Sequence, residues 1–242
     1  MTLQPVADLA FHNVEGWLSH LMVPVIEFAD QHQRRRGVAG DIAEIGVHHG
    51  LMFFMLASCA REDEAALAID LFEDQALNVD GSGNGAGGHF DRNLENLFPN
   101  LKSRVRKLAA DSMGLSAATL RGHMASDGLR LFSVDGGHNI EHVLNDLSLA
   151  QDLVSPGGIV FLDDFFGRCW PSVTEGTFRY FDSHNRRLAP FLIHENKLML
   201  TTYSEHRNTL DALHDFMRDR GDNMAAWLPK KLFGFDIWTR LH

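Results

Sequence analysis

The chain has 242 residues and a formal net charge of −10, with 45% hydrophobic and 22% charged residues. This length and composition predict a globular protein with a substantial core and exclude a disordered chain. Basic residues are scattered apart from Arg34-Arg35-Arg36, which ends a helical pattern, so we do not expect the basic face of a nucleic-acid-binding protein.

Cysteine content and apolar stretches bear on where the protein is located. The two cysteines, Cys59 and Cys169, are too few for a disulfide framework, which is typical of a reducing compartment. No apolar stretch is long enough to span a bilayer, and residues 1–8 lack the layout of a signal peptide. We therefore expect a cytoplasmic protein with no membrane partner.

In chain order, apolar residues at helical spacing from Val14 to Phe28 first predict a helix bent at Pro24. Short apolar runs then alternate with helical patterns. The predicted strands are 41–46, 65–70, 104–109, 129–135 and, after a turn at Pro156-Gly157-Gly158, 159–163. The predicted helices are 51–60, 90–98, 116–124, 140–153, one opened by the capping-box spacing of Ser172 to Glu175, and 208–220. Residues 191–194 and 198–202 flank a turn and predict a closing hairpin.

This alternation predicts an α/β fold, namely a doubly wound, mostly parallel, Rossmann-like sheet with helices on both faces. The closing hairpin makes one strand antiparallel. We expect a single domain, 1–242, with an N-terminal helical extension (1–38), a core (39–203) and a C-terminal helix and tail (204–242).

A glycine turn follows the first strand, at the edge of the sheet where ligands bind in such folds. Gly46 and Gly50 in Glu44-Ile45-Gly46-Val47-His48-His49-Gly50 would let the backbone approach a ligand beside a helix N-terminus. The spacing is not G-x-G-x-x-G, which argues against a standard dinucleotide site. Asp70, about 20 residues after Gly50, could accept hydrogen bonds from two ribose hydroxyls. The alternative is a tight turn without a ligand.

Further acids follow the later strands. Asp111-Ser112 comes after the third strand, where the carboxylate could take an adenine amino group or cap the next helix. Asp135-Gly136-Gly137-His138 follows the fourth strand, and Asp163-Asp164 the fifth. Three carboxylates at adjoining strand ends repel one another unless a cation lies among them, and oxygen ligands favour Mg²⁺. A neutral His138 could accept a proton there, although a surface histidine beside helix-capping acids is the alternative.

The segment 72–88 is a long loop with five glycines between 81 and 88. Loops of this length in compact domains are typical of lids and binding loops. A Ca²⁺-loop pattern also fits in part: Asp80, Ser82, Asn84 and Gly85 match its first half, with Gly85 at the turn position, and Asp91 stands at the twelfth position. The sequence leaves open whether this loop binds a cofactor, an acceptor or Ca²⁺.

Taken in order, these motifs resemble those of class I S-adenosylmethionine-dependent methyltransferases, most closely the metal-dependent sugar and macrolide O-methyltransferases related to macrocin O-methyltransferase. The resemblance covers roughly residues 40–203. The motifs that carry it are Glu44-Ile45-Gly46-Val47-x-x-Gly50, Ile69-Asp70, Val134-Asp135-Gly136-Gly137-His138, Pro156-Gly157-Gly158 and Leu162-Asp163-Asp164. It implies a seven-stranded sheet with S-adenosylmethionine above the first strand ends. It also implies a metal held by Asp135, Asp163 and Asp164, and in some members a histidine base where His138 stands.

We therefore expect an O-methyltransferase that acts, with a divalent metal such as Mg²⁺, on a hydroxyl of a small molecule, namely a sugar or glycosylated metabolite. The expected cofactor-binding residues are Glu44, Gly46, Gly50, Asp70, Asp111 and Ser112. His138 and Asp135 are the expected catalytic residues. Phe165, Phe166 and Trp170 would form an apolar wall against the acceptor or pack in the core. The sequence does not identify the acceptor, and a homo-oligomer is compatible with it.

Three other classes compete with this interpretation. A short-chain dehydrogenase needs Tyr with Lys four residues later, but Tyr180 is followed at that spacing by His184 and Tyr203 by Arg207. A metal-dependent hydrolase would use the three acids to activate water, but it would give Glu44, Gly46 and Asp70 no common function. A non-catalytic protein that binds a nucleotide-like ligand on the same fold stays open on sequence alone.

Overall fold

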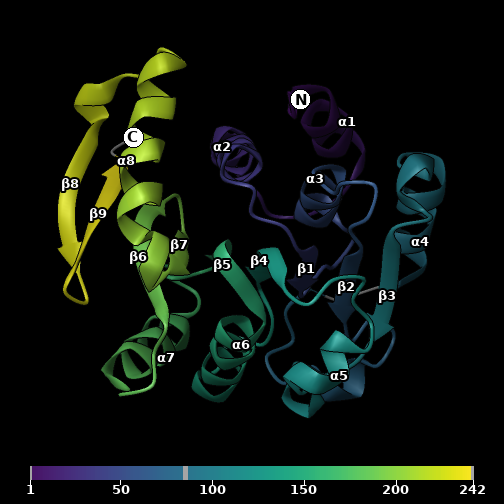
Figure 1. Cartoon of the computed structure of the whole chain (residues 1–242). Helices are drawn as coiled ribbons and strands as arrows, with labels where there is room; N and C mark the ends of the chain where they lie inside the picture. Colours follow the sequence, from purple (N-terminus) through teal and green to yellow (C-terminus); the bar gives the residue numbers. More distant parts are fainter. Residues whose placement is uncertain (1, 84–86, 241–242) are drawn as a thin grey trace.

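Residues 2–83 and 87–240 are described in this computed structural model, and within them nine strands form one mixed sheet (Figure 1). The strand order is β3-β2-β1-β4-β5-β7-β6-β9-β8. The strands are β1 Asp41–Ile45, β2 Ala66–Asp70, β3 Val105–Ala109, β4 Leu129–Val134, β5 Val154–Leu162, β6 Leu188–His194, β7 Lys197–Thr202, β8 Trp227–Leu232 and β9 Phe235–Arg240.

The sheet has the predicted doubly wound topology. β1 pairs in parallel with both β2 and β4, so the strand order reverses beside β1. β7 is antiparallel to β5 and to β6, which confirms the predicted hairpin. Because β1, β2, β3, β4 and β5 are parallel, the loops that follow them gather at one edge of the sheet.

Helices cover both faces of the sheet (Figure 1). The α-helices are α1 Gln4–Asn13, α2 Val23–Arg36, α3 Leu51–Ser58, α4 Gly87–Asn96, α5 Ala117–Arg121, α6 Ile140–Leu153, α7 Pro171–Asp182 and α8 His206–Asp219. α1, α2, α3 and α8 lie on one side, and α5, α6 and α7 lie on the other. Successive strand residues serve different cores, since Ile42 packs into the cluster under α2 and α3 and Ala43 into the cluster under α6.

The N-terminal prediction is wrong in detail. A helix begins at Gln4, while residues 14–19 are not helical and α2 starts only at Val23. Pro24 therefore lies in the first turn of α2 and does not bend a longer helix. The physical reason is that proline has no N–H to donate, which is harmless in a first turn and costly within a helix.

Two further expectations need correction near the fifth strand and the helix after it. β5 already begins at Val154, so Pro156-Gly157-Gly158 lies inside it, where the register with β4 shifts and Gly157 has φ of +82°. α7 begins at Pro171 without a side-chain cap, so Ser172 does not open it as a capping box.

The C-terminal tail forms strands that the sequence did not predict. After α8, β8 and β9 form a hairpin, and β9 extends the sheet by pairing with β6, which gives nine strands where seven were expected. β8 is one outer strand, with Pro229, Lys230 and Lys231 exposed, and β3 is the other, with Arg106 and Lys107 exposed.

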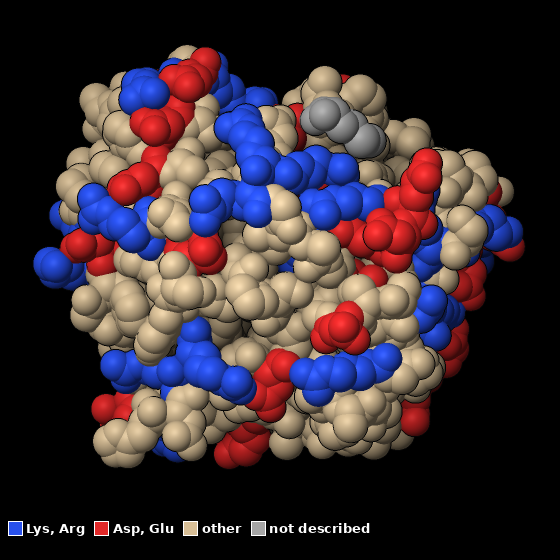
Figure 2. All heavy atoms as spheres, viewed as in Figure 1, with Lys and Arg blue, Asp and Glu red and all other residues tan. Residues whose placement is uncertain are grey.

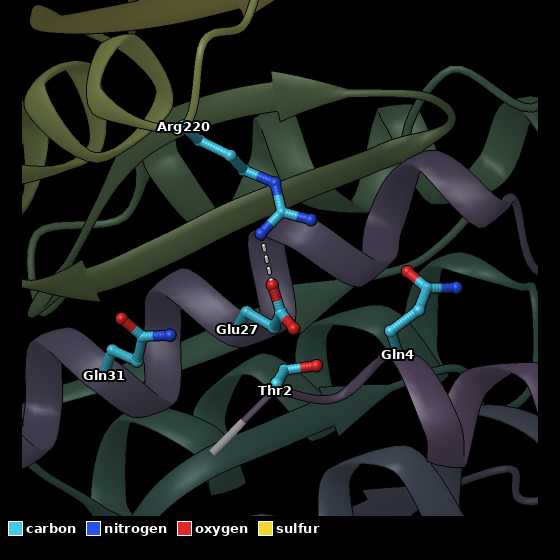
Figure 3. Close-up of a pocket in the computed structure, with 5 residues that line it drawn as sticks. All are labelled: Thr2, Gln4, Glu27, Gln31 and Arg220. Atoms are coloured by element: carbon cyan, nitrogen blue, oxygen red, sulfur yellow. Dashed lines mark hydrogen bonds and ion pairs between the residues drawn. The ribbon is translucent and has the colours of Figure 1, made fainter.

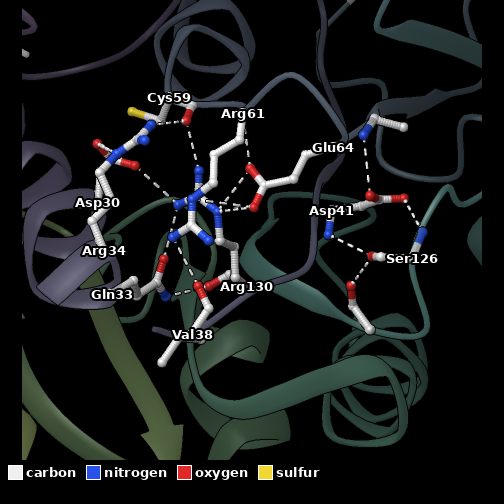
Figure 4. Close-up of polar contacts among 12 residues, drawn as sticks. Asp30, Gln33, Arg34, Val38, Asp41, Cys59, Arg61, Glu64, Ser126 and Arg130 are labelled. Carbon is white, nitrogen blue, oxygen red and sulfur yellow. Dashed lines mark hydrogen bonds and ion pairs between the residues drawn. The ribbon is translucent and has the colours of Figure 1, made fainter. Parts of the chain in front are cut away.

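A buried ion-pair network lies at the amino end of β4, opposite the edge where ligands bind (Figure 4). The Arg130 side chain is fully buried, and its Nε lies 2.9 and 3.0 Å from the two carboxylate oxygens of Glu64. Its remaining nitrogens reach Gln33 and Asp30 of α2 and the carbonyl oxygen of Cys59 after α3. Arg130 thus ties β4 to α2 and to the segment between α3 and β2.

On the face shown in Figure 2, blue Lys and Arg side chains lie among red Asp and Glu side chains and do not form one continuous basic surface. Within the residues described, no helix has the length and apolar character needed to cross a membrane.

Candidate functional site

The glycine turn after β1 is held against the loops that follow β2 and β4. The backbone N–H of His48 donates to the carboxylate of Asp70 at 2.9 Å, so the acid lies directly below the turn. Gly46 has φ of +82°, and a Cβ built there would lie 1.7 Å from the carbonyl oxygen of Asp135. A side chain at position 46 is therefore excluded both by backbone conformation and by space. The turn therefore contacts both Asp70 and the backbone of Asp135.

Two of the expected cofactor residues after β3 have structural roles. Asp111 caps the short helical turn 112–114 by accepting a hydrogen bond from the N–H of Met113 at 2.9 Å. The carbonyl oxygen of Ser112 accepts from the side chain of Asn145 in α6. Asp111 therefore acts as a helix cap, which was one of the two roles expected for it. Its other carboxylate oxygen stays available to a ligand. Asp146, beside Asn145, is buried, and burial raises its pKa to about 6.

Asp135, His138 and Asp164 come together at the ends of β4 and β5. Their candidate ligand atoms all lie within 4.8 Å of one another, and no other such group of His, Cys, Asp and Glu occurs among the residues described. His138 Nε2 is 3.3 Å from Asp164 Oδ2 and 3.8 Å from Asp135 Oδ1. Asp164 has φ of +54°, an unusual conformation for a non-glycine residue and one that recurs at functional sites.

The opposite side of the His138 ring is held by a residue from the long loop. Asp80 Oδ2 lies 2.8 Å from His138 Nδ1 and also accepts the backbone N–H of His138 at 2.8 Å. Asp91 instead pairs with Lys107 at 2.9 Å, so Asp80 and Asp91 do not converge as a Ca²⁺ loop requires. Asn84 and Gly85 of that pattern lie outside the residues described. Asp80 was a candidate only as a Ca²⁺ ligand, and its partnership with His138 was missed.

These carboxylates set the charge of His138. Burial lowers the pKa of His138, but the hydrogen bonds and charges of Asp135, Asp164 and Asp80 outweigh burial and raise it to about 10. Without a cation among the acids, the ring is therefore an imidazolium at neutral pH.

Asp163, an expected metal ligand, is turned toward a lysine. Lys197, the first residue of β7, is buried and donates to Asp163 Oδ2, while the backbone N–H of Asp164 donates to Asp163 Oδ1 at 2.7 Å. Burial and the charge of Asp135 raise the pKa of Asp163 to about 7, although Lys197 opposes this. Burial lowers the pKa of Lys197, but Asp163 and Asp135 outweigh it and hold that pKa above the usual value. The sequence analysis did not identify Lys197.

Glu44, at the end of β1, is buried beside the same acids. Its Oε2 atom has no hydrogen-bond partner within the structure described. Burial raises the pKa of Glu44 well above its usual value, and the charge of Asp135 adds to the effect. An unpaired buried oxygen next to the glycine turn is suited to a donor group on a bound ligand.

The aromatic residues after β5 divide into two groups. Phe165 is fully buried and belongs to the core, so it cannot form a wall against an acceptor. Trp170 stacks on the His138 ring, with centroids 4.3 Å apart, and Phe166 is 56% exposed. At the glycine turn, the ring centroid of the exposed Trp17 lies 5.0 Å from that of His48.

Two surface cavities lie elsewhere on the molecule, and none of the expected cofactor, metal or catalytic residues lines either of them. One, of about 510 Å³, is bordered by Thr2, Gln4, Glu27, Gln31 and Arg220 (Figure 3). Its carboxylate is already paired, since Glu27 accepts from Arg220 at 2.5 Å and from the N–H of Leu3 at 2.6 Å. This cavity lies between the N-terminal segment, α2 and the end of α8. Its lining has no group of acids and histidine like the one around His138. The other, of about 260 Å³, lies near Trp227.

Comparison with known proteins identifies the family. The model of a methyltransferase domain matches residues 43–165, just over half of the chain and the part that contains the glycine turn and the acids. The chain belongs to this methyltransferase family. The match confirms the sequence-based interpretation that the protein is a class I methyltransferase, the class that uses S-adenosylmethionine. No curated protein matches the sequence at a significant level.

Solved structures share the fold of this methyltransferase. The O-methyltransferase NovP superposes with a TM-score of 0.59 at 20% identity, over 76% of this chain and 83% of NovP. An O-methyltransferase from Bacillus cereus in complex with SAH gives 0.57 at 15% identity, over 83% and 90% of the two chains. CalS11, a TDP-rhamnose 3′-O-methyltransferase of calicheamicin biosynthesis, gives 0.52 at 16% identity, over 83% and 92%.

Proposed function

We propose that this methyltransferase transfers a methyl group from S-adenosylmethionine to a hydroxyl of a small molecule, a sugar or glycosylated metabolite, with a divalent cation. The observation that carries the proposal is the convergence of Asp135, His138 and Asp164 beside the glycine turn. CalS11 acts on a sugar nucleotide within the same fold, which supports a sugar acceptor.

The cofactor site is assigned to the turn and to the acids beside it. Asp70 has two carboxylate oxygens, each with a lone pair left for a ribose hydroxyl after the backbone bonds are counted. Gly46 and Gly50 let the turn pack closely on Asp135 and Phe54 at the N-terminus of α3, and Glu44 offers its unpaired oxygen. Asp111 and Ser112 complete the proposed site on the adenine side. The Bacillus cereus O-methyltransferase of the same fold is in complex with SAH, which supports S-adenosylmethionine as the ligand of this site.

The acids fit a divalent cation. Asp135 and Asp164 each present a carboxylate oxygen toward His138, and the group contains no thiolate. Oxygen ligands of this kind suit Mg²⁺ or Mn²⁺. A cation bound there would lower the pKa of the acceptor hydroxyl and orient it. When the charges of the two acids are neutralised in this way, the pKa of His138 falls toward its ordinary value.

His138 is then the proton acceptor. The acceptor oxygen attacks the methyl carbon, the new C–O bond forms as the C–S bond breaks, and the electron pair of that bond stays on sulfur. The hydroxyl proton passes to His138 Nε2, which faces the acids, while Nδ1–H stays bonded to Asp80. Trp170 and Asp80 hold the ring in one orientation, so that Nε2 is the atom presented to the acceptor. Phe166 and Trp170 provide apolar surface for the acceptor.

The test is product formation. The protein is incubated with S-adenosylmethionine and a panel of sugars, nucleoside-diphosphate sugars and glycosides, with and without Mg²⁺, and S-adenosylhomocysteine and methylated product are measured by mass spectrometry. We expect Mg²⁺-dependent product from at least one hydroxylated acceptor. Methyl transfer only to amines or thiols would contradict the proposal. Assembly as a homo-oligomer and a cytoplasmic location, which two free cysteines suit, stay predictions.

A further inference from the structure

A buried lysine lies inside the acidic group at the carboxyl edge of the sheet. Lys197 is only 2% exposed, and its Nζ donates to Asp163 Oδ2. The carboxylates of Asp135 and Glu44 also act on its charge. An ammonium group is rarely placed in a protein interior unless opposite charge surrounds it. Lys197 therefore supplies, from within the protein, positive charge that this group of acids would otherwise need from a cation.

The turn that carries Lys197 also fixes the orientation of both acids after β5. Asn196 Nδ2 donates to Asp164 Oδ1 at 3.1 Å, and the N–H of Phe165 donates to the carbonyl oxygen of Asn196 at 2.8 Å. Asp164 Oδ2 is left to face His138. Both oxygens of Asp163, in contrast, already accept a hydrogen bond, from Lys197 and from the N–H of Asp164.

We propose that Lys197 is a positioning residue that neutralises Asp163 and keeps that carboxylate out of the metal-ligand set, so that Asp135 and Asp164 are the carboxylates offered to the cation. The inference deepens the metal-assisted part of the proposed function and rests on it. It revises the expectation that Asp163 is the third ligand. The β6–β7 turn thereby decides how many charged oxygens the site presents, and hence how tightly it holds a cation.

The test measures Mn²⁺ binding by calorimetry and electron paramagnetic resonance in the otherwise intact protein. In Lys197→Met, Asp163 is released, and we expect Mn²⁺ to bind about tenfold more tightly, the size of effect typical of residues behind metal ligands. The double variant Lys197→Met/Asp163→Asn removes both charges, and its affinity should stay within about threefold of wild type. Lys231→Met is the matched control, because Lys231 pairs with Asp236 on the surface.

The outcomes separate this inference from the proposed function. If the double variant binds Mn²⁺ more than about tenfold more weakly than wild type, Asp163 is a ligand and the inference is overturned. If Lys197→Met does not fold, the double variant alone decides between these outcomes. A folded Lys197→Met that binds no more tightly than wild type would also overturn it. Binding to Lys197→Met but not to wild type would support the lysine's role while contradicting metal assistance in the native enzyme. Methyl transfer is assayed separately and does not enter this decision.

Discussion

Asp80 and His138 lie 58 residues apart in the sequence, yet Asp80 Oδ2 is 2.8 Å from His138 Nδ1. The contact joins the loop after β2 to the loop after β4, across the end of β1. It assigns the two ring nitrogens different partners, with Nδ1 bonded to Asp80 and Nε2 facing Asp135 and Asp164. A histidine held in this way presents one defined nitrogen to a substrate proton.

The first prediction concerns this contact. Asp80→Asn removes one of the three carboxylates that raise the pKa of His138 to about 10, so that pKa should fall. Histidine-selective NMR titration of the metal-free protein would measure the shift. Asp74→Asn, an exposed acid in the same loop, should leave the titration of His138 unchanged. An identical midpoint in Asp80→Asn and wild type would refute a role for Asp80 in holding the ring.

The second prediction concerns the cofactor. Asp70→Ala should weaken S-adenosylmethionine binding by about tenfold to hundredfold per hydrogen bond lost, because hydrogen bonds to a charged group contribute about 1.5–3 kcal/mol each. Isothermal calorimetry gives the affinity directly. The control is Asp127→Ala, since Asp127 is exposed in the loop before β4. Equal binding by Asp70→Ala and wild type would remove Asp70 from the site.

The third prediction separates proton transfer from binding. His138→Ala should slow methyl transfer about 10²- to 10⁴-fold while leaving the affinity for S-adenosylmethionine nearly unchanged. Asp164→Asn is the appropriate companion, because asparagine tolerates the φ of +54° at this position, whereas alanine would add strain. It should lose metal dependence and activity together. Full activity of both variants in a chelator would show that neither residue acts in catalysis.

The fourth prediction follows from the pKa of Asp146, which burial raises to about 6. A carboxyl whose folded pKa is raised above its unfolded value favours the folded state only while it is protonated. The contribution of Asp146 to stability should therefore decrease as pH rises from about 4 to 6, by up to about 3 kcal/mol. Asp146→Asn should remove this decrease and unfold at a higher urea concentration than wild type at pH 7. A pH dependence unchanged by the substitution would show that Asp146 titrates normally.

The fifth prediction concerns the network in Figure 4. Arg130→Met removes the fully buried cation that Glu64 and Asp30 share and should lower the free energy of unfolding by about 3–5 kcal/mol. Arg179→Met, at an exposed pair with Glu175, should cost less than about 1 kcal/mol. Chemical denaturation of both variants tests the difference. Similar losses in the two would mean that burial of Arg130 has no special consequence.

Much of the fold was predictable because the apolar pattern of each buried strand is local. The runs at β1, β2 and β4 read as strands on sequence alone, and the residues after them had to meet because parallel strands end at one edge. This geometry was sufficient to bring Asp135, His138 and Asp164 together. That Asp164 and not Asp163 faces His138 depends on the local backbone, since Asp164 has φ of +54° and Asp163 pairs with Lys197.

The features that escaped prediction depend on contacts between distant segments. Lys197 follows a turn where an exposed lysine is the ordinary expectation, and only packing against β5 shows that it is buried beside Asp163. Asp80 lies in a polar, glycine-rich loop with no periodic pattern to locate it. β8 was missed because Pro229-Lys230-Lys231 interrupts the alternation of an ordinary strand, which an outer strand tolerates since one side of it makes no ladder.

The outer strands of the sheet have a consequence for how copies of the chain meet. β8 exposes Lys230 and Lys231 beside Pro229, and β3 exposes Arg106 and Lys107. Joining two molecules strand to strand would bring like charges together, and Pro229 has no N–H to extend the ladder. Both outer strands of the nine-stranded sheet thus disfavour growth into an intermolecular β-structure.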